Sequence, residues 1–574
     1  MKREKKRCII AILCALLLIL SMAACSGEGV LPDEMIQSDS GEQSTAKAAD
    51  KDSAGDLDTS ESTQAAASQG DTEKEMPSGS EEQDSADRIR PAIELGSMYI
   101  RETDDSGEVV YVSGSHDTIR LSEESQAVYP QLAAAVENKM DAETRQVKKE
   151  IEEFAGYYQE DPSTADPDKG YEITDQLFIR RADRRVLSAL KYSYRYSGGA
   201  HGYFGYSCLN LDAETGEEIS LDDVIVDRGA LSEQIQAELL KKYDEDTFFD
   251  YMPETIEDEA MEEGDLSLTW TLDPQGLTFY FAPYEIAPNA SGAFQVTLLY
   301  DSAQSTDTNL FTDKYRPEEG EGYICGISPF TDCYADVDQD GETDRVYIGY
   351  TVDPETDSIR EMSVEVNNET FSIDEMYCYR VEPVMVTAGD GRVFLYAWCR
   401  SDNDFVNMYM FDLSLGSPVS MGTMALSEVY MYIEEEEADY SSYKRLITDS
   451  DHMLLSTRYD LLSTYDVEKE YYISDNSPVP VSDEPYYRIV RDTTLTSVKD
   501  IPAQIVDEEG NVIESARVIP AGSTYKLYRT DGLNIVDALL EDGSNARLLV
   551  TGTYPQKVNG MDAEEVFEQL FYAG

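Results

Sequence analysis

The sequence predicts an α+β protein: an N-terminal antiparallel sheet with packed helices, followed by a mainly β C-terminal region that ends in a small SH3-like barrel or sandwich. Residues 190–196 alternate apolar and polar side chains, as a half-buried strand does, whereas residues 122–158 and 230–243 have helical patterns. From about residue 323 onward, short aromatic strands alternate with acidic turns. These patterns divide the chain into five predicted parts: a leader at 1–24, a linker at 25–88, an α+β domain at 89–306, a mainly β region at 323–487 and a small β module at 488–574.

The N-terminus has the order of charged, apolar and small residues that is typical of a secretory signal. MKREKKR is strongly cationic, an apolar run covers residues 8–20, and two alanines precede Cys25. The segment Met22-Ala23-Ala24-Cys25 resembles a lipobox, although a lipobox usually begins with Leu. The resemblance implies that Cys25 carries a diacylglycerol with palmitate-type chains and is held at the extracytoplasmic face of the cell membrane. An uncleaved membrane helix is the alternative, but the apolar run is short for a span of about 20 residues.

The composition is strongly acidic, with a formal net charge of -70 at pH 7. A surface of this charge attracts cationic proteins, cationic peptides and divalent metal ions. Nucleic-acid binding is excluded, because no basic stripe is present to neutralise phosphates. Residues 25–88 lack aromatic side chains and are rich in Ser, Asp, Glu, Gln, Gly and Ala, which predicts a disordered acidic linker.

The elements expected between residues 89 and 306 follow from capping and alternation. Strands are expected at 109–112 and 118–121, and Ser122 can cap a helix that runs to about Tyr158, with Pro130 as an alternative start. The remaining elements come in chain order: strands at 190–196 and 203–211 around a glycine-rich turn, a helix at 230–243, a hairpin of 266–272 with 276–281, and a strand at 295–300. In the last module, strands at 522–528 and 546–550 precede a short helix at 562–571.

Five cysteines remain beyond residue 25: Cys208, Cys325, Cys333, Cys378 and Cys399. One or two disulfides in the C-terminal half are compatible with an extracellular location, and the odd number leaves at least one thiol unpaired. The spacing matches no zinc pattern and histidine is nearly absent, so a zinc site is not expected.

The glycine-rich turn belongs to a longer motif. Residues 192–224 read YSYRYSGGAHGYFGYSCLNLDAETGEEISLDDV, and residues 281–292 fit the pattern Phe-x-x-Tyr-x-x-x-Pro-x-x-x-Gly. Together, over about residues 91–301, these motifs resemble the extracellular domain (DUF3298/DUF4163-like) shared by RsiV-type anti-sigma factors and PdaC-type peptidoglycan deacetylases. The resemblance implies ligand capture, because the RsiV-type domain binds lysozyme, and an acidic receptor suits a basic enzyme.

The chain departs from both kinds of protein in this family. Deacetylation is not expected, because the three histidines, His116, His201 and His452, include no His-x-x-x-His motif. RsiV-type proteins carry a cytoplasmic sigma-binding segment before a membrane helix. Here a lipid anchor and a linker are predicted in that place, so sigma-factor signalling is not expected either. The resemblance leaves His201, Gly199 and Tyr284 as candidate ligand-binding residues.

Two other roles remain open for His201, and two structural roles are possible for the neighbouring tyrosines. His201 is able to lock the turn through a neighbouring carboxylate or carbonyl, or to act in catalysis. An aromatic row such as Tyr192, Tyr194 and Tyr196 is more often part of a hydrophobic core than of a binding surface.

A second motif, Asp336-Val337-Asp338-Gln339-Asp340-Gly341-Glu342-Thr343-Asp344, precedes a strand at 345–350. Its spacing predicts a structural calcium site with five ligands: Asp336, Asp338, Asp340, Glu342 and Asp344. Position 12 is Tyr347 rather than Glu, so the loop is not an EF-hand; it resembles the Asp-rich loops of secreted calcium-binding β modules. A solvated acidic turn is the alternative.

These features predict a membrane-anchored lipoprotein that binds a cell-wall-related ligand, either a lysozyme-like cationic protein or peptidoglycan, and that is not an enzyme. One alternative is an envelope hydrolase or modifying enzyme, although no nucleophile elbow or zinc signature can be singled out. The other is a structural envelope lipoprotein without a soluble ligand. Calcium is the one cofactor expected.

Overall fold

The computed structural model describes residues 90–572, apart from 105–106, 108, 168, 200, 263–266, 301–309, 318–322, 355, 357, 389, 402–404, 428, 433–439, 475 and 483. The described residues all belong to one compact unit, Ser80–Gly574. The predicted leader, the lipidation site Cys25 and the predicted linker lie outside them. In the part that is described, no helix combines the length and the apolar character needed to cross a bilayer.

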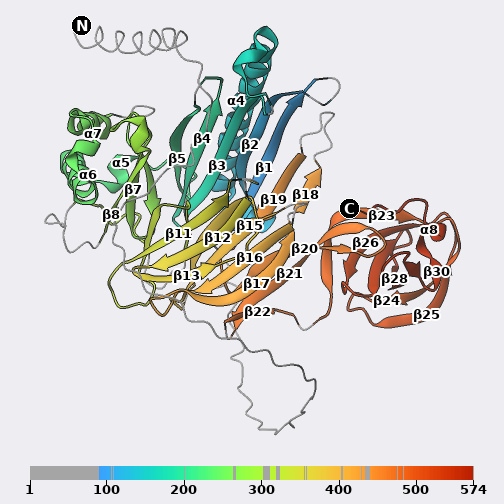
Figure 1. The fold of residues 1–574 in the computed structure, drawn as a ribbon. Helices are drawn as coiled ribbons and strands as arrows, with labels where there is room; N and C mark the ends of the chain where they lie inside the picture. Colours follow the sequence, from blue (N-terminus) through green and yellow to red (C-terminus); the bar gives the residue numbers. More distant parts are fainter. Residues whose placement is uncertain are drawn as a thin grey trace, which may run out of the picture. The chain divides into compact units, whose positions relative to one another are not determined.

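A seven-stranded sheet contains the first strands of the part of the chain that the structure describes, in the order β18-β19-β1-β2-β3-β4-β5 (Figure 1). Its strands are β1 (Ile93–Thr103), β2 (Val110–Leu121), β3 (Tyr171–Ala182), β4 (Val186–Tyr196), β5 (Tyr203–Asp212), β18 (Val429–Tyr432) and β19 (Tyr440–Arg445). β2 and β3 run parallel, and the other neighbours are antiparallel. The two short strands expected at 109–112 and 118–121 are the single strand β2.

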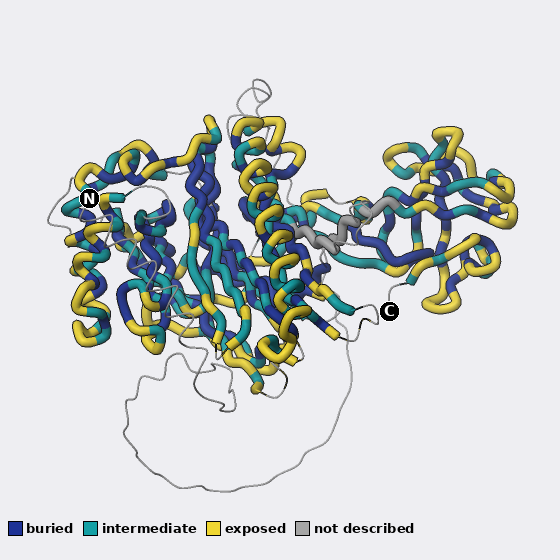
Figure 2. Tube along the Cα trace, turned by 90° about the horizontal axis from the view of Figure 1, so that it is seen from above, coloured by how far each residue is buried: buried dark blue, intermediate teal, exposed yellow. Residues whose placement is uncertain are grey.

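Two helices, α3 (Glu123–Val128) and α4 (Pro130–Glu160), connect the parallel strands β2 and β3. Ser122 caps α3 by accepting a hydrogen bond from the Ser125 N–H, and Pro130 begins α4, where a proline leaves no helical hydrogen bond unmade. Both expected helix starts are therefore used. α4 lies along one face of the sheet (Figure 1) and buries a single stripe against it while its outer side is exposed (Figure 2): Leu132, Val136, Met140 and Val147.

A small second layer packs beside β4 and β5. It consists of the antiparallel strands β6 (Thr269–Asp273), β7 (Gly276–Phe281) and β8 (Phe294–Leu299), and of the helices α5 (Leu221–Val224), α6 (Arg228–Lys242) and α7 (Met252–Met261). The helices and strands share one apolar core. The Leu272 N–H donates to Ser188 Oγ, and Asn210 Nδ2 donates to the Trp270 carbonyl, so this layer is fixed to the large sheet.

Two further sheets form a sandwich in the middle of the chain. The four-stranded sheet has the order β10-β11-β12-β13, and the five-stranded sheet has the order β17-β16-β15-β14-β9. The strands are β9 (Tyr323–Gly326), β10 (Asp332–Ala335), β11 (Asp344–Asp353), β12 (Ser358–Val366), β13 (Glu369–Ile373), β14 (Arg380–Thr387), β15 (Val393–Arg400), β16 (Phe405–Asp412) and β17 (Val419–Ser427). Apolar side chains from both sheets meet in one core, as expected for a sandwich.

The C-terminal part is almost entirely strand, arranged in one branched sheet along the path β20-β21-β23-β26-β27-β28-β24-β25. Its elements are β20 (Met453–Asp460), β21 (Thr464–Ser474), β22 (Ser477–Pro480), β23 (Tyr487–Thr496), β24 (Ile501–Val506), β25 (Val512–Ile519), β26 (Thr524–Thr530), β27 (Ile535–Leu540), β28 (Asn545–Thr551), β29 (Lys557–Val558), β30 (Met561–Asp562) and α8 (Ala563–Val566). The expected helix at 562–571 is thus reduced to one turn. The predicted α+β class is confirmed.

The large sheet does not end at the predicted boundary near residue 306. β19 pairs antiparallel with β1, for example Gly96 with Tyr443, and so adds residues from far along the chain. One apolar core likewise joins Ile93 and Leu187 to Phe394 and Met453. The described residues of the first predicted domain therefore share their core with the strands that follow.

Candidate functional site

The glycine-rich turn at the tip of the β4–β5 hairpin needs glycine at two positions. Gly198 has φ 98°, and a Cβ there would lie 2.6 Å from the carbonyl oxygen of Thr164. A Cβ on Gly202 would lie 2.4 Å from the ring of Tyr194. The turn is therefore packed between the short 3-10 turn Pro162–Thr164, which follows α4, and the strand β4, and any larger side chain at these positions would force them apart.

His201 is exposed at this tip, and its Nδ1 lies 3.0 Å from the Gly202 carbonyl oxygen. The hydroxyl of Tyr196 donates to the Gly199 carbonyl at 3.1 Å. These contacts suit a side chain that locks the turn, and the exposed imidazole also remains available to a ligand. The role of His201 stays a prediction.

The tyrosines of β4 lie on the sheet face opposite α4. The alternate residues Lys191 and Arg195 form ion pairs with Glu143 and Glu150 of α4, which places the tyrosines on the other side. The register aligns Tyr192 with Tyr206 and Tyr194 with Phe204 on β5, and Tyr196 with Glu172 on β3. We call this set the tyrosine face: Tyr192, Tyr194, Tyr196, Phe204, Tyr206 and Glu172.

The tyrosine face is half-buried rather than part of the closed core. Its rings are in contact, with centroids 5.4 Å apart for Tyr192 and Phe204 and 6.3 Å apart for Phe204 and Tyr206. Burial and the nearby Glu172 carboxylate raise the pKa of Tyr194, and burial and Asp166 raise the pKa of Tyr196. The face thus combines neutral phenol rings with carboxylates, a surface suited to a cationic side chain.

The pattern at residues 281–292 follows the strand β7, which contacts this face through one aromatic ring. The centroids of Tyr206 and Tyr280, the latter near the end of β7, are 5.6 Å apart. Tyr284, three residues beyond β7, is 58% exposed and has φ 70°, an uncommon conformation for a residue other than glycine. Within the described part of the chain, neither a hydrogen bond nor a ring contact joins Tyr284 to His201 or Gly199. The structure therefore places the candidate ligand-binding residues on two different loops, and no contact among the described residues brings them into one cluster.

A pair of carboxyl groups beside Tyr284, those of Glu259 and Glu285, was not predicted from the sequence. Burial, followed by the charge and hydrogen bond of Glu285, raises the pKa of Glu259 on α7 to about 8. Burial also raises the pKa of Glu285, whose Oε2 accepts a hydrogen bond from the Ala282 N–H at 2.6 Å. The two groups therefore share a proton near neutral pH.

This shared proton makes folding depend on pH. The unfolded chain releases the Glu259 proton near the ordinary value of 4.5, whereas the folded chain keeps it to about 8. The folded state binds more protons in this window, so stability falls as pH rises through it. Glu259→Gln is expected to remove that part of the slope in melting temperature against pH, and Glu257→Gln, an exposed neighbour on α7, should not. Parallel curves for Glu259→Gln and the parent protein would exclude the shared proton.

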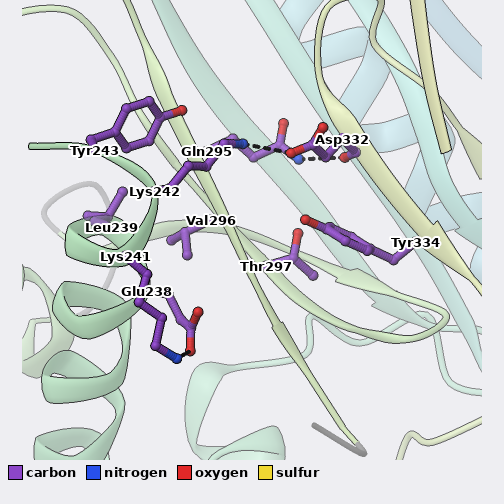
Figure 3. Close-up of a pocket in the computed structure, with 10 residues that line it drawn as sticks. All are labelled: Glu238, Leu239, Lys241, Lys242, Tyr243, Gln295, Val296, Thr297, Asp332 and Tyr334. Atoms are coloured by element: carbon purple, nitrogen blue, oxygen red, sulfur yellow. Dashed lines mark hydrogen bonds and ion pairs between the residues drawn. The ribbon is translucent and has the colours of Figure 1, made fainter. Parts of the chain in front are cut away.

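A pocket of about 170 Å³ opens between α6, β8 and β10 (Figure 3). Lys242 Nζ lies 2.6 Å from Asp332 Oδ2, and Gln295 Nε2 donates to the Asp332 carbonyl at 2.9 Å. None of the predicted site residues lines it. The pocket is well below the roughly 300 Å³ at which small-molecule sites begin, and its polar groups already bond one another.

The acidic loop between β10 and β11 brings three of the five predicted metal ligands together. Carboxylate oxygens of Asp336, Asp338 and Asp340 lie within 4.8 Å of one another. Asp336 also accepts backbone N–H groups from Asp340 and Gly341, both at 3.1 Å, which folds the loop back on itself. Gly341 has φ 87°, so this turn requires a glycine.

The other two predicted ligands lie elsewhere in the loop. Glu342 is exposed and outside the group of three. Asp344 is buried, where it accepts the Val337 N–H at 3.0 Å and Asn367 Nδ2 at 2.6 Å. In this geometry the buried Asp344 holds the loop through its hydrogen bonds. The other three aspartates offer the oxygen-rich surface that calcium prefers.

The comparisons with known proteins match the segment that holds the Phe-x-x-Tyr-x-x-x-Pro-x-x-x-Gly pattern of residues 281–292. Residues 222–301 match the family model described as "Protein of unknown function (DUF3298)". The chain carries a DUF3298-type domain. This confirms the predicted resemblance for that segment, which includes Tyr284 and the Glu259–Glu285 pair but begins after the His201 turn.

Two solved structures of DUF3298 proteins are similar to part of the chain. The one from Bacteroides fragilis NCTC 9343 has 20% identity and a TM-score of 0.30, covering 39% of this chain and 95% of that chain. The one from Pseudomonas aeruginosa PAO1 has 21% identity and a TM-score of 0.27, covering 40% of this chain and 96% of that chain. No curated protein matches the chain.

Proposed function

We propose that this protein is a lipoprotein held by a lipid on Cys25 at the extracytoplasmic face of the cell membrane, and that its tyrosine face captures a lysozyme-like cationic protein. The observation that carries the proposal is the half-buried tyrosine row beside Glu172, on the face of the sheet opposite α4, part of which the β6–β7 hairpin covers. Tyrosines of this kind supply large contact area, and an arginine from a partner pairs with both a phenol ring and a carboxylate.

The charge of the chain favours a cationic protein over peptidoglycan. A net charge of -70 attracts a basic partner over a distance and raises its association rate. The tyrosines would also stack on sugar rings, so peptidoglycan remains the competing ligand. Binding of peptidoglycan fragments with no binding of lysozyme would favour it instead.

The proposed role is capture without chemistry. The tyrosine face offers phenols whose pKa values burial raises, and such neutral phenols are poor bases near neutral pH. Turnover of peptidoglycan fragments by the purified protein would contradict this part of the proposal and favour an envelope hydrolase or modifying enzyme.

Substitution on the tyrosine face tests the site. Tyr196→Ala and Glu172→Gln are each expected to weaken lysozyme binding about tenfold or more, as for residues central to an interface. The control is Tyr554→Ala, because Tyr554 is an exposed tyrosine in the C-terminal part, away from the tyrosine face, and its hydroxyl donates to the Glu564 carboxylate. Calorimetric titration gives the affinities, and circular dichroism checks that each variant is folded. Equal losses in all three variants would indicate non-specific charge attraction.

We also propose that the loop of Asp336, Asp338 and Asp340 binds calcium in a structural role. An ion there would neutralise three carboxylates that repel one another in its absence. Calcium is expected to raise the melting temperature of the full chain, and Asp338→Asn to remove this rise. The control Asp374→Asn changes an exposed acid on a different turn of the same sheet and should keep it. An unchanged melting temperature of the parent protein in calcium would contradict the proposal.

A further inference from the structure

Four of the cysteines fall into two pairs inside the middle sandwich. Cys325 Sγ and Cys333 Sγ are 2.9 Å apart, and both residues are 1% exposed. Cys325 is on β9 of the five-stranded sheet, and Cys333 is on β10 of the four-stranded sheet. The sulfur atoms are therefore about 0.9 Å beyond the length of a disulfide bond, across the interface between the sheets.

The second pair has the same arrangement. Cys378 and Cys399 are buried in the same apolar core, and the Tyr379 N–H beside Cys378 donates to the Arg400 carbonyl beside Cys399 at 2.8 Å. The Cys399 thiol lowers the pKa of Cys378. Cys399 is on β15 of the five-stranded sheet, and Cys378 is bridged to Ile359 on β12 of the four-stranded sheet, with the Ile359 N–H donating to the Cys378 carbonyl at 2.7 Å. Each pair thus joins a residue of one sheet to a residue held by the other.

We infer that Cys325–Cys333 and Cys378–Cys399 form two disulfides that fasten the two sheets of the sandwich together, and that Cys208 keeps its thiol. Cys208 is on β5, in the large sheet, and its thiol lies 3.9 Å from Asn210 Nδ2. Burial raises the pKa of Cys208, which makes it a poor nucleophile for exchange.

The arrangement does not suit a metal centre. Among the described residues, the one group of three or more His, Cys, Asp or Glu side chains close enough to hold an ion is the aspartate loop. The four thiols lie as two separate pairs in one apolar core. A two-sulfur pair without further ligands is the arrangement of a disulfide, not of a tetrahedral zinc site.

The oxidation requires a disulfide donor, which we take to be an oxidised dithiol protein of the envelope. One cysteine thiolate attacks a sulfur of the donor disulfide and forms a mixed disulfide, and the second cysteine displaces the donor. The donor leaves as a dithiol carrying two electrons and two protons for each bond formed. Because the sulfurs are buried in the fold, this exchange takes place before the sandwich closes.

The disulfides require an oxidising compartment, so the inference rests on the export step of the proposed function. The loops they close extend over 325–333 and 378–399 in the chain, and closing either loop restricts the unfolded state. Oxidised full-length protein is therefore expected to melt about 5–10 °C above the reduced protein.

Differential alkylation of the full-length protein from membranes of the producing cell tests the pairing. After denaturation without reductant, a first alkylating reagent should label Cys208 alone among these five residues. After reduction, a second reagent should label the other four, and peptide mapping of the unreduced protein should give two linked pairs, 325 with 333 and 378 with 399. Any other linkage among these residues would overturn the inference. Labelling of all five by the first reagent would overturn it too, unless the refolding experiment below gives the same two pairs.

A second experiment separates the pairing from the export step. The full chain, reduced, denatured and refolded with oxidised glutathione, is expected to form the same two pairs. Correct pairs after refolding but free thiols in the cell would contradict export and leave the pairing supported. Mixed linkages after refolding, with Cys208→Ala behaving like the parent protein, would overturn the pairing itself.

Discussion

Asp273→Ala is expected to lower the free energy of unfolding by about 3–5 kcal/mol, because it leaves Arg180 as an uncompensated buried charge. Arg180 and Asp273 are only 1% and 5% exposed. The guanidinium forms a two-point contact with the carboxylate, with Nε 3.1 Å from Oδ1 and Nη2 against Oδ2. Two threonines donate to the same carboxylate: Thr271 at 2.8 Å and Thr278 at 2.7 Å.

The reason for so large an effect is the position of this ion pair between three parts of the fold. Arg180 comes from β3, Asp273 from the β6–β7 hairpin, and Arg180 Nη1 donates to the Gly326 carbonyl of β9 at 2.8 Å. Urea unfolding followed by circular dichroism measures the loss. Glu514→Gln removes an exposed ion pair with Arg517 and should change stability little.

A double variant checks the physical cause. Arg180→Met combined with Asp273→Leu removes both charges and is expected to regain a substantial part of the stability that Asp273→Ala loses. If the double variant is less stable than the single variant, packing around the carboxylate rather than the unpaired arginine accounts for the loss.

Cys25→Ala is expected to abolish fatty-acid labelling of the protein completely. Each buried methylene of an acyl chain contributes about 0.8 kcal/mol to membrane binding, so two chains anchor a protein stably. Metabolic labelling with a radioactive fatty acid measures the modification. Cys208→Ala, which changes a cysteine inside the fold, should keep the label. Label that persists in Cys25→Ala, or that is missing from the parent protein, would contradict the lipid anchor.

Local sequence signals predicted the elements that local forces stabilise. The alternation around Tyr192 and Tyr194 corresponds to β4, and the cap at Ser122 and the proline at 130 correspond to the starts of α3 and α4. The pairing of β1 with β19 had no such signal, because Gly96 and Tyr443 are separated by most of the chain. No pattern within either strand specifies so distant a partner.

The residues of the candidate sites also divide into those with a local sequence signal and those without one. The aspartate loop is a local motif, so Asp336, Asp338 and Asp340 were found from their spacing. The Glu259–Glu285 pair joins a helix to a loop, and nothing in the acidic sequence around Glu259 distinguishes it from its neighbours. The cysteine pairs are likewise a product of how two sheets pack. Spacing alone permits several pairings of five cysteines, whereas the sandwich brings specific sulfur atoms together.

The most direct test of ligand capture is a titration of lysozyme into the full chain at about 0.15 M salt, where exposed charges more than about 8 Å apart are largely screened. Saturable one-to-one binding that Tyr196→Ala weakens about tenfold is the result expected from a tyrosine face with a specific partner. A heat of binding that is lost at this salt concentration would show that the acidic chain attracts lysozyme without recognising it. An affinity that is the same for Tyr196→Ala and the parent protein would show the same.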